Sequence, residues 1–166
     1  MPLVFHQLDP IFDQNSKVLI LGSFPSPKSR ESGFYYGHPQ NRFWPLLSFL
    51  LKEQCPRNNE EKKRFLLRNR IALWDVLASC KIKGAEDGSI SSPVPNDLSS
   101  LLQECSITTI FTAGKKATAL YHRFCLPFTG IDSIYLPSTS PANRARFPME
   151  RLAEEWEVVL KKLKQV

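Results

Sequence analysis

The spacing of apolar residues along the chain predicts three buried strands. KVLILG (residues 17–22) and ITTIFTAG (residues 107–114) are short apolar runs with β-branched residues, and each ends in glycine. Such runs are typical of strands that are buried on both faces of a sheet. SIYLPS (residues 133–138) is predicted as the third strand. The long segments between these runs leave room for helices.

Helices are predicted between and after the strands. NRFWPLLSFLLKE, in the stretch from Pro39 onward, places Phe43, Leu47, Leu50 and Leu51 on one helical face. Pro45 lies early enough to be tolerated in the first turn. Further helices are predicted over residues 58–70, from an N-cap at Asp97, over 115–124 and over 148–164, the last with Leu152, Trp156, Val159, Leu160 and Leu163 on one face.

Two segments are interpreted without strands. IALWDVLASC (residues 71–80) is interpreted as an apolar turn and a short helix, and KIKGAEDGSISSPVPND (residues 81–97) as a long loop rich in turn residues. Asp75 lies between apolar residues in the first of them. We expect its side chain to be buried and to brace a loop rather than to titrate in catalysis.

The order of strands and helices predicts an α/β fold with a mostly parallel sheet covered on both faces. In such sheets, ligands bind beyond the carboxyl ends of the strands. Three loops follow those ends: residues 23–37, the turn around Gly114, and residues 139–147. The sequence therefore predicts a pocket among these loops, bordered by GHPQNRFW (residues 37–44).

Length and charge narrow the class of protein. A chain of 166 residues fits one domain, which we assign to residues 1–166. The 22 Lys and Arg residues exceed the 16 Asp and Glu residues by a net charge of +6, which favours an acidic partner such as nucleic acid. The alternative is a solvated basic surface that binds nothing.

The cysteines and the first residues bear on metal binding and location. Cys55, Cys80, Cys105 and Cys125 lie far apart, so no C-x-x-C metal-ligand pair exists, and we expect free thiols in a reducing compartment. The start of the chain, MPLVFHQLDPIF, has no basic region before a long apolar run, which predicts no signal peptide. No apolar window has the length of a membrane span. We expect a cytoplasmic protein without membrane contact.

Four motifs occur in one order along the chain: LGSFPS, GFYYGHPQNRFW, ALWDVLASC and LPSTSPANR. Together they resemble the uracil-DNA glycosylase superfamily over about residues 15 to 165. The combination of GSFPS and STSPANR is most similar to the hypoxanthine-DNA (deoxyinosine) glycosylase branch. The stretch GFYYGHPQNRFW is also similar to the mismatch-specific uracil/thymine branch.

The resemblance implies a three-layer α/β/α fold with a central four-stranded, mostly parallel sheet. The fourth strand is then expected in or near residues 71–73, or between the second and third strands. The implied activity is hydrolysis of the N-glycosidic bond of a deaminated base that is flipped out of DNA, which leaves an abasic site. Hypoxanthine is the first candidate and uracil the second. No metal or organic cofactor is implied, and we expect a monomer.

Two positions depart from the pattern of most branches. Phe24 stands where they carry an Asp or Asn that handles the attacking water, and residues 138–141 read Ser-Thr-Ser-Pro without a histidine. The hypoxanthine branch is similar in both respects. There, the residue implicated in catalysis is the asparagine that matches Asn41. The departures speak against the uracil activity typical of other branches.

Asn41 is therefore the candidate catalytic residue, and Tyr36 heads the candidates for the base pocket. The amide of Asn41 both donates and accepts, so it can hold a water or a purine edge, although a helix-capping role is the alternative. Tyr36 matches the aromatic residue that stacks on the flipped base, and a core tyrosine is its alternative. The other candidates for the base pocket are Ser23, Phe24, His38 and Gln40.

Residues 138–143 match the loop that enters the minor groove. Pro141 and Ala142 are small and stiff enough to fill the space left by a flipped base, and Asn143 can contact a base edge. The alternative is a polar turn before the last helix. The full set of candidate DNA-binding residues is Ser138, Ser140, Pro141, Ala142, Asn143, Arg144, Arg146, Lys115, Lys116 and Lys28.

Two rival functions stay open at this point. A damaged-DNA recognition module with little or no catalysis would fit the loss of the polar side chain at Phe24. A hydrolase of free nucleosides is harder to reconcile with the basic loops, because a neutral small substrate does not require them.

Overall fold

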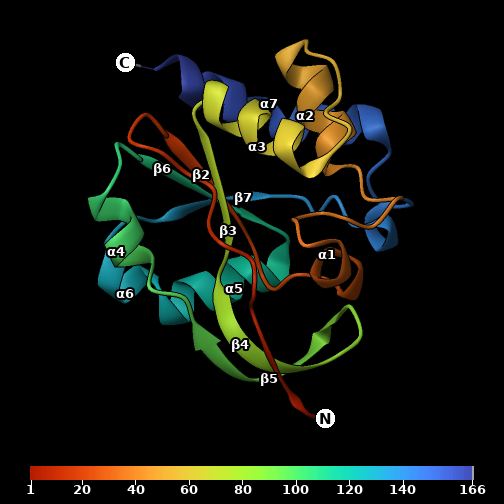
Figure 1. Ribbon diagram of the computed structural model, residues 1–166, viewed down its shortest axis with the longest axis vertical. Helices are drawn as coiled ribbons and strands as arrows, with labels where there is room; N and C mark the ends of the chain where they lie inside the picture. Colours follow the sequence, from red (N-terminus) through yellow and green to blue (C-terminus); the bar gives the residue numbers. More distant parts are fainter. Residues whose placement is uncertain (166) are drawn as a thin grey trace.

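A parallel sheet of four strands forms the centre of the chain, whose computed structural model describes residues 1–165 (Figure 1). The strand order is β3-β2-β6-β7, and each neighbouring pair is parallel. The predicted strands are confirmed as β2 (Val18–Gly22), β6 (Thr109–Ala113) and β7 (Ser133–Leu136). The fourth strand, β3 (Ile71–Asp75), occupies the first of the two expected places.

Helices cover both faces of this sheet. Val18 and Ile20 of β2 pack with one helical layer, while Leu19 and Leu21 pack with the other, because successive strand residues point to opposite faces. Figure 1 shows one layer above the sheet and the other below it. The first layer contains α2 (Phe43–Leu51), α3 (Asn59–Arg68) and α7 (Met149–Lys164), and the second contains α4 (Leu98–Gln103), α5 (Lys115–Phe124) and α6 (Leu126–Thr129). The predicted three-layer α/β/α class is confirmed.

A second sheet replaces two segments that were predicted without strands. The turn and short helix over residues 71–80 and the loop over 81–97 are both wrong, because β3 runs directly into β4 (Leu77–Lys83) and β5 (Glu86–Pro95). Together with β1 (Leu3–Phe5), these strands form an antiparallel sheet of order β1-β4-β5. The side chains of β5 are mostly exposed, so the strand carries no apolar periodicity. Its prolines are tolerated because β5 is an edge strand.

The first long loop contains a helix that the sequence did not reveal. Within residues 23–37, α1 (Pro27–Ser32) begins after Ser26, whose side-chain oxygen accepts from the Ser29 backbone N–H at 3.2 Å. Pro27 occupies the first turn, and Gly33 ends the helix in the left-handed region with φ 77°. The helix lies beyond the carboxyl end of β2.

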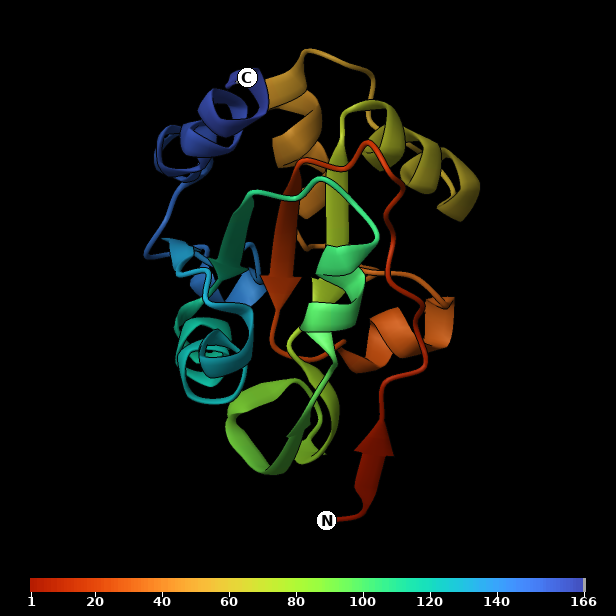
Figure 2. The ribbon, with the colours of Figure 1, turned by 90° about the vertical axis from the view of Figure 1, so that its left-hand side faces the viewer.

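The central strands point toward α1 and the β4–β5 hairpin. Figure 2 shows their arrowheads directed at this end of the molecule. The α/β rule therefore locates the ligand site between the hairpin, α1 and the loop after β7. Within residues 1–165, no helix has the length and apolar content needed to cross a membrane.

Candidate functional site

A pocket of about 150 Å³ opens at the carboxyl ends of β2, β3 and β6. Most of the predicted pocket and loop residues line it: Ser23, Phe24, Tyr36, His38, Asn41, Ser138, Ser140 and Pro141. Gln40 does not line it and is exposed on the outside. The lining also includes side chains that were not predicted, namely Asp75, Asp87, Ile82, Ala85 and Thr139.

Asn41 joins the start of α2 to the loop after β7. Its Oδ1 atom accepts from the Phe43 backbone N–H at 2.9 Å and from Thr139 Oγ1 at 2.8 Å. A backbone N–H can only donate, so the atom that faces Phe43 is the amide oxygen. Within residues 1–165, the Nδ2 group donates to no protein atom. Asn41 therefore braces the helix start and offers the pocket a donor, not an acceptor.

Tyr36 is both a core residue and a pocket residue. One face of its ring stacks on Phe43, with centroids 4.0 Å apart and an interplanar angle of 11°. Its backbone is in the left-handed region with φ 53°, which is uncommon for a non-glycine residue. The hydroxyl group is buried and has no hydrogen-bond partner within residues 1–165. Burial raises the pKa of Tyr36 above its usual range, and Asp75 and Asp87 raise it further, so the phenol keeps its proton and can donate.

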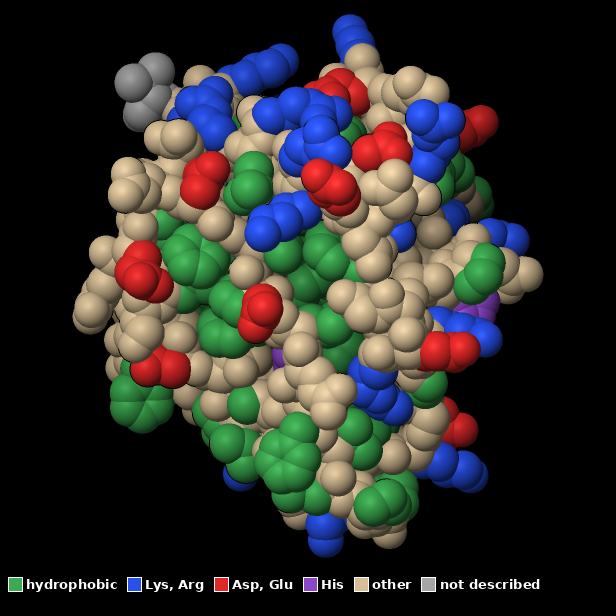
Figure 3. Space-filling model, in the orientation of Figure 1, with side chains coloured by type: hydrophobic (Ala, Val, Ile, Leu, Met, Phe, Trp, Pro, Cys, Tyr) green, Lys and Arg blue, Asp and Glu red, His purple; other side chains and the backbone are tan. Residues whose placement is uncertain are grey.

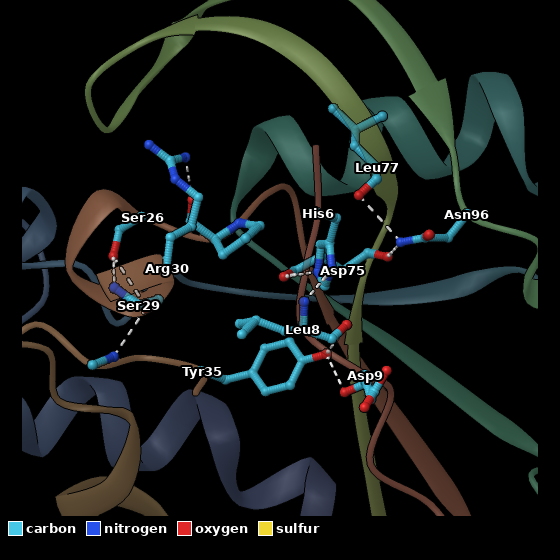
Figure 4. Close-up of polar contacts among 12 residues, drawn as sticks. His6, Leu8, Asp9, Ser26, Ser29, Arg30, Tyr35, Asp75, Leu77 and Asn96 are labelled. Atoms are coloured by element: carbon cyan, nitrogen blue, oxygen red, sulfur yellow. Dashed lines mark hydrogen bonds and ion pairs between the residues drawn. The ribbon is translucent and has the colours of Figure 1, made fainter. Parts of the chain in front are cut away.

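Asp75 lines the pocket at the end of β3, and Figure 4 shows its carboxylate beside His6. We call this end of the pocket its floor. The residue is 4% exposed, and its Oδ2 lies 2.9 Å from Nε2 of His6. Since Nδ1 of His6 accepts from the Leu8 N–H at 3.3 Å, Nε2 carries the proton and donates to Asp75. The expected burial of Asp75 is confirmed, but its carboxylate faces the pocket.

Gly22 makes room for two of these groups. A Cβ atom at this position would lie 2.6 Å from Asp75 Oδ1 and 3.3 Å from the Tyr36 hydroxyl oxygen. Asp75 Oδ1 and the Tyr36 hydroxyl therefore converge on the end of β2, where only glycine fits. Asp75 Oδ1 is an acceptor and the Tyr36 hydroxyl is a donor. Together they can bind a ligand whose polar edge carries a donor beside an acceptor.

Asp87 brings a second carboxylate from the hairpin. Ser23 Oγ donates to its Oδ1 atom at 2.8 Å, which links the end of β2 to β5. Burial of the carboxyl group and the nearby Asp75 raise the pKa of Asp87, while the Ser23 hydrogen bond and Lys116 act in the opposite direction. The net result is a carboxyl group that holds its proton at higher pH than usual.

The backbone that supports the floor is fixed by side chains from distant segments. Asn96 Nδ2 donates to the Asp75 and Leu77 carbonyl oxygens at 2.9 and 3.1 Å, where β3 continues into β4. The Tyr35 hydroxyl donates to the Asp9 carbonyl oxygen at 2.7 Å, as Figure 4 shows. The pocket floor is therefore braced from the first residues of the chain and from the segment after β5.

The rim loop, residues 138–147, is tightly folded rather than extended. Pro141–Asn143 form a 3-10 turn, and Asn143 Nδ2 donates to the Ser138 carbonyl oxygen at 2.9 Å. Thr139 is 2% exposed and anchors the loop on Asn41, while Ala142 is exposed and Pro141 is half-buried. The loop thus presents small, stiff residues at its tip from a fixed base.

The predicted basic residues lie outside the pocket. Lys28, Lys115, Arg144 and Arg146 are exposed, and Lys116 is half-buried. Only Lys28 among these five has an ion-pair partner within residues 1–165, Glu31 at 3.8 Å. On α3, by contrast, Arg64 pairs with Glu60 at 3.0 Å, and Figure 3 shows Lys and Arg side chains interspersed with carboxylates over α3 and α7. Uncompensated positive charge is therefore available beside the pocket.

Sequence reasoning missed the pocket residues Asp75 and Asp87, and His6, which donates to Asp75, for different reasons. Asp75 is the last residue of β3, a position that would have marked it had residues 71–75 been recognised as a strand. Asp87 lies in an exposed hairpin, and His6 contacts a residue 69 positions away, so neither carried a local signal. Within residues 1–165, no three His, Cys, Asp or Glu side chains form a metal site.

Fold and pocket together define an α/β ligand-binding protein with its site at the carboxyl ends of a parallel sheet. A sequence model of the Uracil DNA glycosylase superfamily matches residues 10–164. The chain therefore belongs to the Uracil DNA glycosylase superfamily, which confirms the resemblance of its motifs.

Individual relatives agree with this membership. The chain is 37% identical over 153 residues to a hypoxanthine DNA glycosylase of Methanosarcina acetivorans, covering 91% of this chain and 94% of the relative. It is 36% identical over 137 residues to a hypoxanthine DNA glycosylase of Methanosarcina barkeri, covering 81% and 85%. A solution NMR structure from Methanosarcina acetivorans, described as a candidate uracil DNA glycosylase, superposes with a TM-score of 0.82 at 35% identity, covering 99% of this chain and 100% of the other.

The Asn41–Thr139 hydrogen bond can be tested by Thr139→Val, which keeps the shape of the side chain but removes its hydroxyl donor. We expect the free energy of unfolding to fall by about 1 kcal/mol. We also expect faster amide exchange at Arg42, whose N–H donates to the Thr139 carbonyl oxygen at 3.2 Å. Urea denaturation and hydrogen exchange measure the two effects. Thr108→Val, at an exposed position, is the control, and equal stability of both variants would contradict the prediction.

Proposed function

We propose that the chain is a monofunctional DNA glycosylase that hydrolyses the N-glycosidic bond of a deaminated base, with hypoxanthine as the main substrate. The base is flipped out of DNA into the pocket, and an abasic site remains. The observation that carries the proposal is one pocket lined by three groups that have no partner within residues 1–165: Asn41 Nδ2, and the Tyr36 hydroxyl and Asp75 Oδ1, which converge at Gly22. The names of the relatives support the same activity.

The floor of the pocket distinguishes hypoxanthine from adenine, and uracil from cytosine, on chemical grounds. Hypoxanthine presents an N1–H donor beside the O6 acceptor, whereas adenine presents an acceptor at N1 and an amino donor at C6. Asp75 Oδ1 can accept from N1–H, and the Tyr36 hydroxyl can donate to O6. Adenine would set its N1 lone pair against the carboxylate, and a buried polar group left unpaired costs binding energy. Uracil has the same donor-beside-acceptor edge, so it is the second candidate.

Asn41 is suited to the leaving base. Negative charge develops on the base as the glycosidic bond breaks, and a fixed donor stabilises such charge best where water is excluded. Both hydrogen bonds to Oδ1 fix the amide of Asn41, which lines the pocket, so Nδ2 can donate without further ordering. One face of the Tyr36 ring already stacks on Phe43, so the hydroxyl group of Tyr36, and not its ring, is assigned to the base.

The rim residues are proposed to hold DNA around the flipped base. Pro141 and Ala142 at the loop tip would fill the space left in the duplex. Unstacking costs a few kcal/mol, and less for a mispaired base, which favours deaminated sites. Arg144, Arg146, Lys115, Lys116 and Lys28 are proposed to contact phosphates, with Ser138, Ser140 and Asn143 beside them.

We propose that one copy of the chain is sufficient for the activity. We place the activity inside the cell, in the cytoplasm with the DNA. The residues present supply donors, acceptors and a carboxylate pair, so the proposed hydrolysis uses no cofactor.

The direct test is single-turnover incubation with labelled DNA that contains one hypoxanthine or one uracil opposite each normal base, followed by alkaline strand scission. We expect scission at hypoxanthine, with less at uracil. Tight binding without scission at either base would contradict the proposal and indicate a damaged-DNA recognition module instead.

Asn41→Asp removes the Nδ2 donor of Asn41 and adds a negative charge to the pocket. The substituted carboxylate can still accept from the Phe43 N–H and Thr139 Oγ1, so the helix start stays braced, but the Nδ2 donor is lost. We expect the single-turnover rate on hypoxanthine DNA to fall by roughly 10²–10³-fold, the usual cost of one such donor. DNA affinity should change little. A variant with the normal rate would show that Asn41 does not contact the leaving base.

The double substitution Arg144→Ala and Arg146→Ala tests the phosphate contacts. We expect weaker binding to every DNA sequence and a salt-dependence slope reduced by about 2, because two phosphate contacts are lost. Binding titrations over a salt series measure the slope. Arg64→Ala, which removes an arginine already paired with Glu60, is the control and should keep the slope. If the double variant has the same slope as the native protein, Arg144 and Arg146 do not contact phosphates.

A further inference from the structure

The proposed hydrolysis requires a group that accepts a proton from the attacking water. Asn41 cannot do this, because its Oδ1 atom already accepts two hydrogen bonds and its remaining group is a donor. Asp75 is bound through Oδ2 to His6, and its Oδ1 is assigned to the N1–H group of the base. Among the acidic side chains that line the pocket, Asp87 remains.

We propose that Asp87 is a second catalytic residue, the carboxylate that binds and deprotonates the attacking water; this inference rests on the proposed glycosylase function. Ser23 Oγ holds Asp87 Oδ1 at 2.8 Å. Within residues 1–165, the Oδ2 atom accepts no hydrogen bond, so one oxygen is anchored and the other is available to a water.

Depth in the pocket separates the roles of the two carboxylates. Asp75 is 4% exposed at the end of β3, whereas Asp87 is an exposed residue of the β4–β5 hairpin whose carboxyl group reaches inward to Ser23. A base that enters the pocket stays attached to a sugar whose phosphates remain outside, so the sugar occupies the mouth. The floor carboxylate then meets the base edge, and the hairpin carboxylate meets C1′ of the sugar.

The charges around Asp87 suit this role. Asp75 faces it from β3, Lys116 from α5, and the Tyr36 hydroxyl and the Cys80 thiol also lie in its field. Burial and Asp75 raise the pKa of Asp87 in spite of Ser23 and Lys116, which brings its basicity closer to neutral pH. A negative carboxylate beside C1′ also stabilises a sugar with oxocarbenium character.

The step balances without a further reactant. The water oxygen bonds to C1′ as the C1′–N9 bond breaks, and the electron pair of that bond leaves with the base. The water proton passes to Asp87 Oδ2 and then to solvent. The departing base accepts a hydrogen bond from Asn41 Nδ2 and takes a proton from solvent, giving neutral hypoxanthine and an abasic sugar.

Asp87→Asn tests the inference, with Glu86→Gln as the matched control. Glu86 is the neighbouring carboxylate on the same hairpin, and it does not line the pocket. Single-turnover rates on duplex DNA with one deoxyinosine are measured over an acidic-to-neutral pH series, together with binding to DNA that contains an abasic site. We expect the rate of the native protein to rise with pH as Asp87 loses its proton. Asp87→Asn should lower the rate by about 10²–10⁴-fold, remove this rise and leave binding unchanged. Glu86→Gln should retain both the rate and the rise.

Four results would overturn the assignment. An Asp87→Asn protein with the native rate excludes a catalytic role for Asp87. An Asp87→Asn protein that is slower but whose rate still rises with pH assigns that rise to another group. Loss of rate and binding together would make Asp87 a structural residue of the hairpin. If the native protein excises no base at all, the proposed function fails at that step, and the role of Asp87 fails with it.

Discussion

The pocket depends on two hydrogen bonds to a single amide oxygen. Oδ1 of Asn41 accepts from the first turn of α2 and from Thr139, and so joins a helix of the core layer to the loop after β7. Each such bond contributes about 1 kcal/mol of stability, but their geometric effect is larger. They fix the orientation of the amide, close one wall of the pocket and set the base of the rim loop. The remaining features of the site are arranged around this junction.

Strain and close approach are concentrated at the same end of the sheet. Tyr36 adopts a left-handed backbone conformation, which costs of order 1–3 kcal/mol and is held by its stacking on Phe43. Gly22 lets the Asp75 carboxylate and the Tyr36 hydroxyl approach the end of β2. A preorganised polar pocket of this kind binds without reordering its own side chains, since the packed core has already fixed them.

The pattern of apolar residues predicted those elements whose structure depends on residues close in the sequence. The apolar runs of β2, β6 and β7 and the amphipathic α7 followed from periodicity, and the motif resemblance brought Asn41 and Tyr36 to the pocket. The prediction for residues 71–80 was wrong because a buried strand that bends into a second sheet has the same composition as a helix segment. Asp87 and His6 could not be identified from the sequence. Their partners, Ser23 and Asp75, lie 64 and 69 positions away, and no spacing rule spans such distances.

The pocket is shared between two sheets, and they meet at one bend. Val76 and Leu77 donate to the Gly22 and Ser23 carbonyl oxygens at 2.8 and 3.1 Å, where the chain leaves the central sheet for the hairpin. These two hydrogen bonds tie the start of the hairpin that carries Asp87 to the end of β2. Asp75 ends β3, and β3 continues into the hairpin through Val76. A displacement of the hairpin would therefore move Asp87 and disturb Asp75 together.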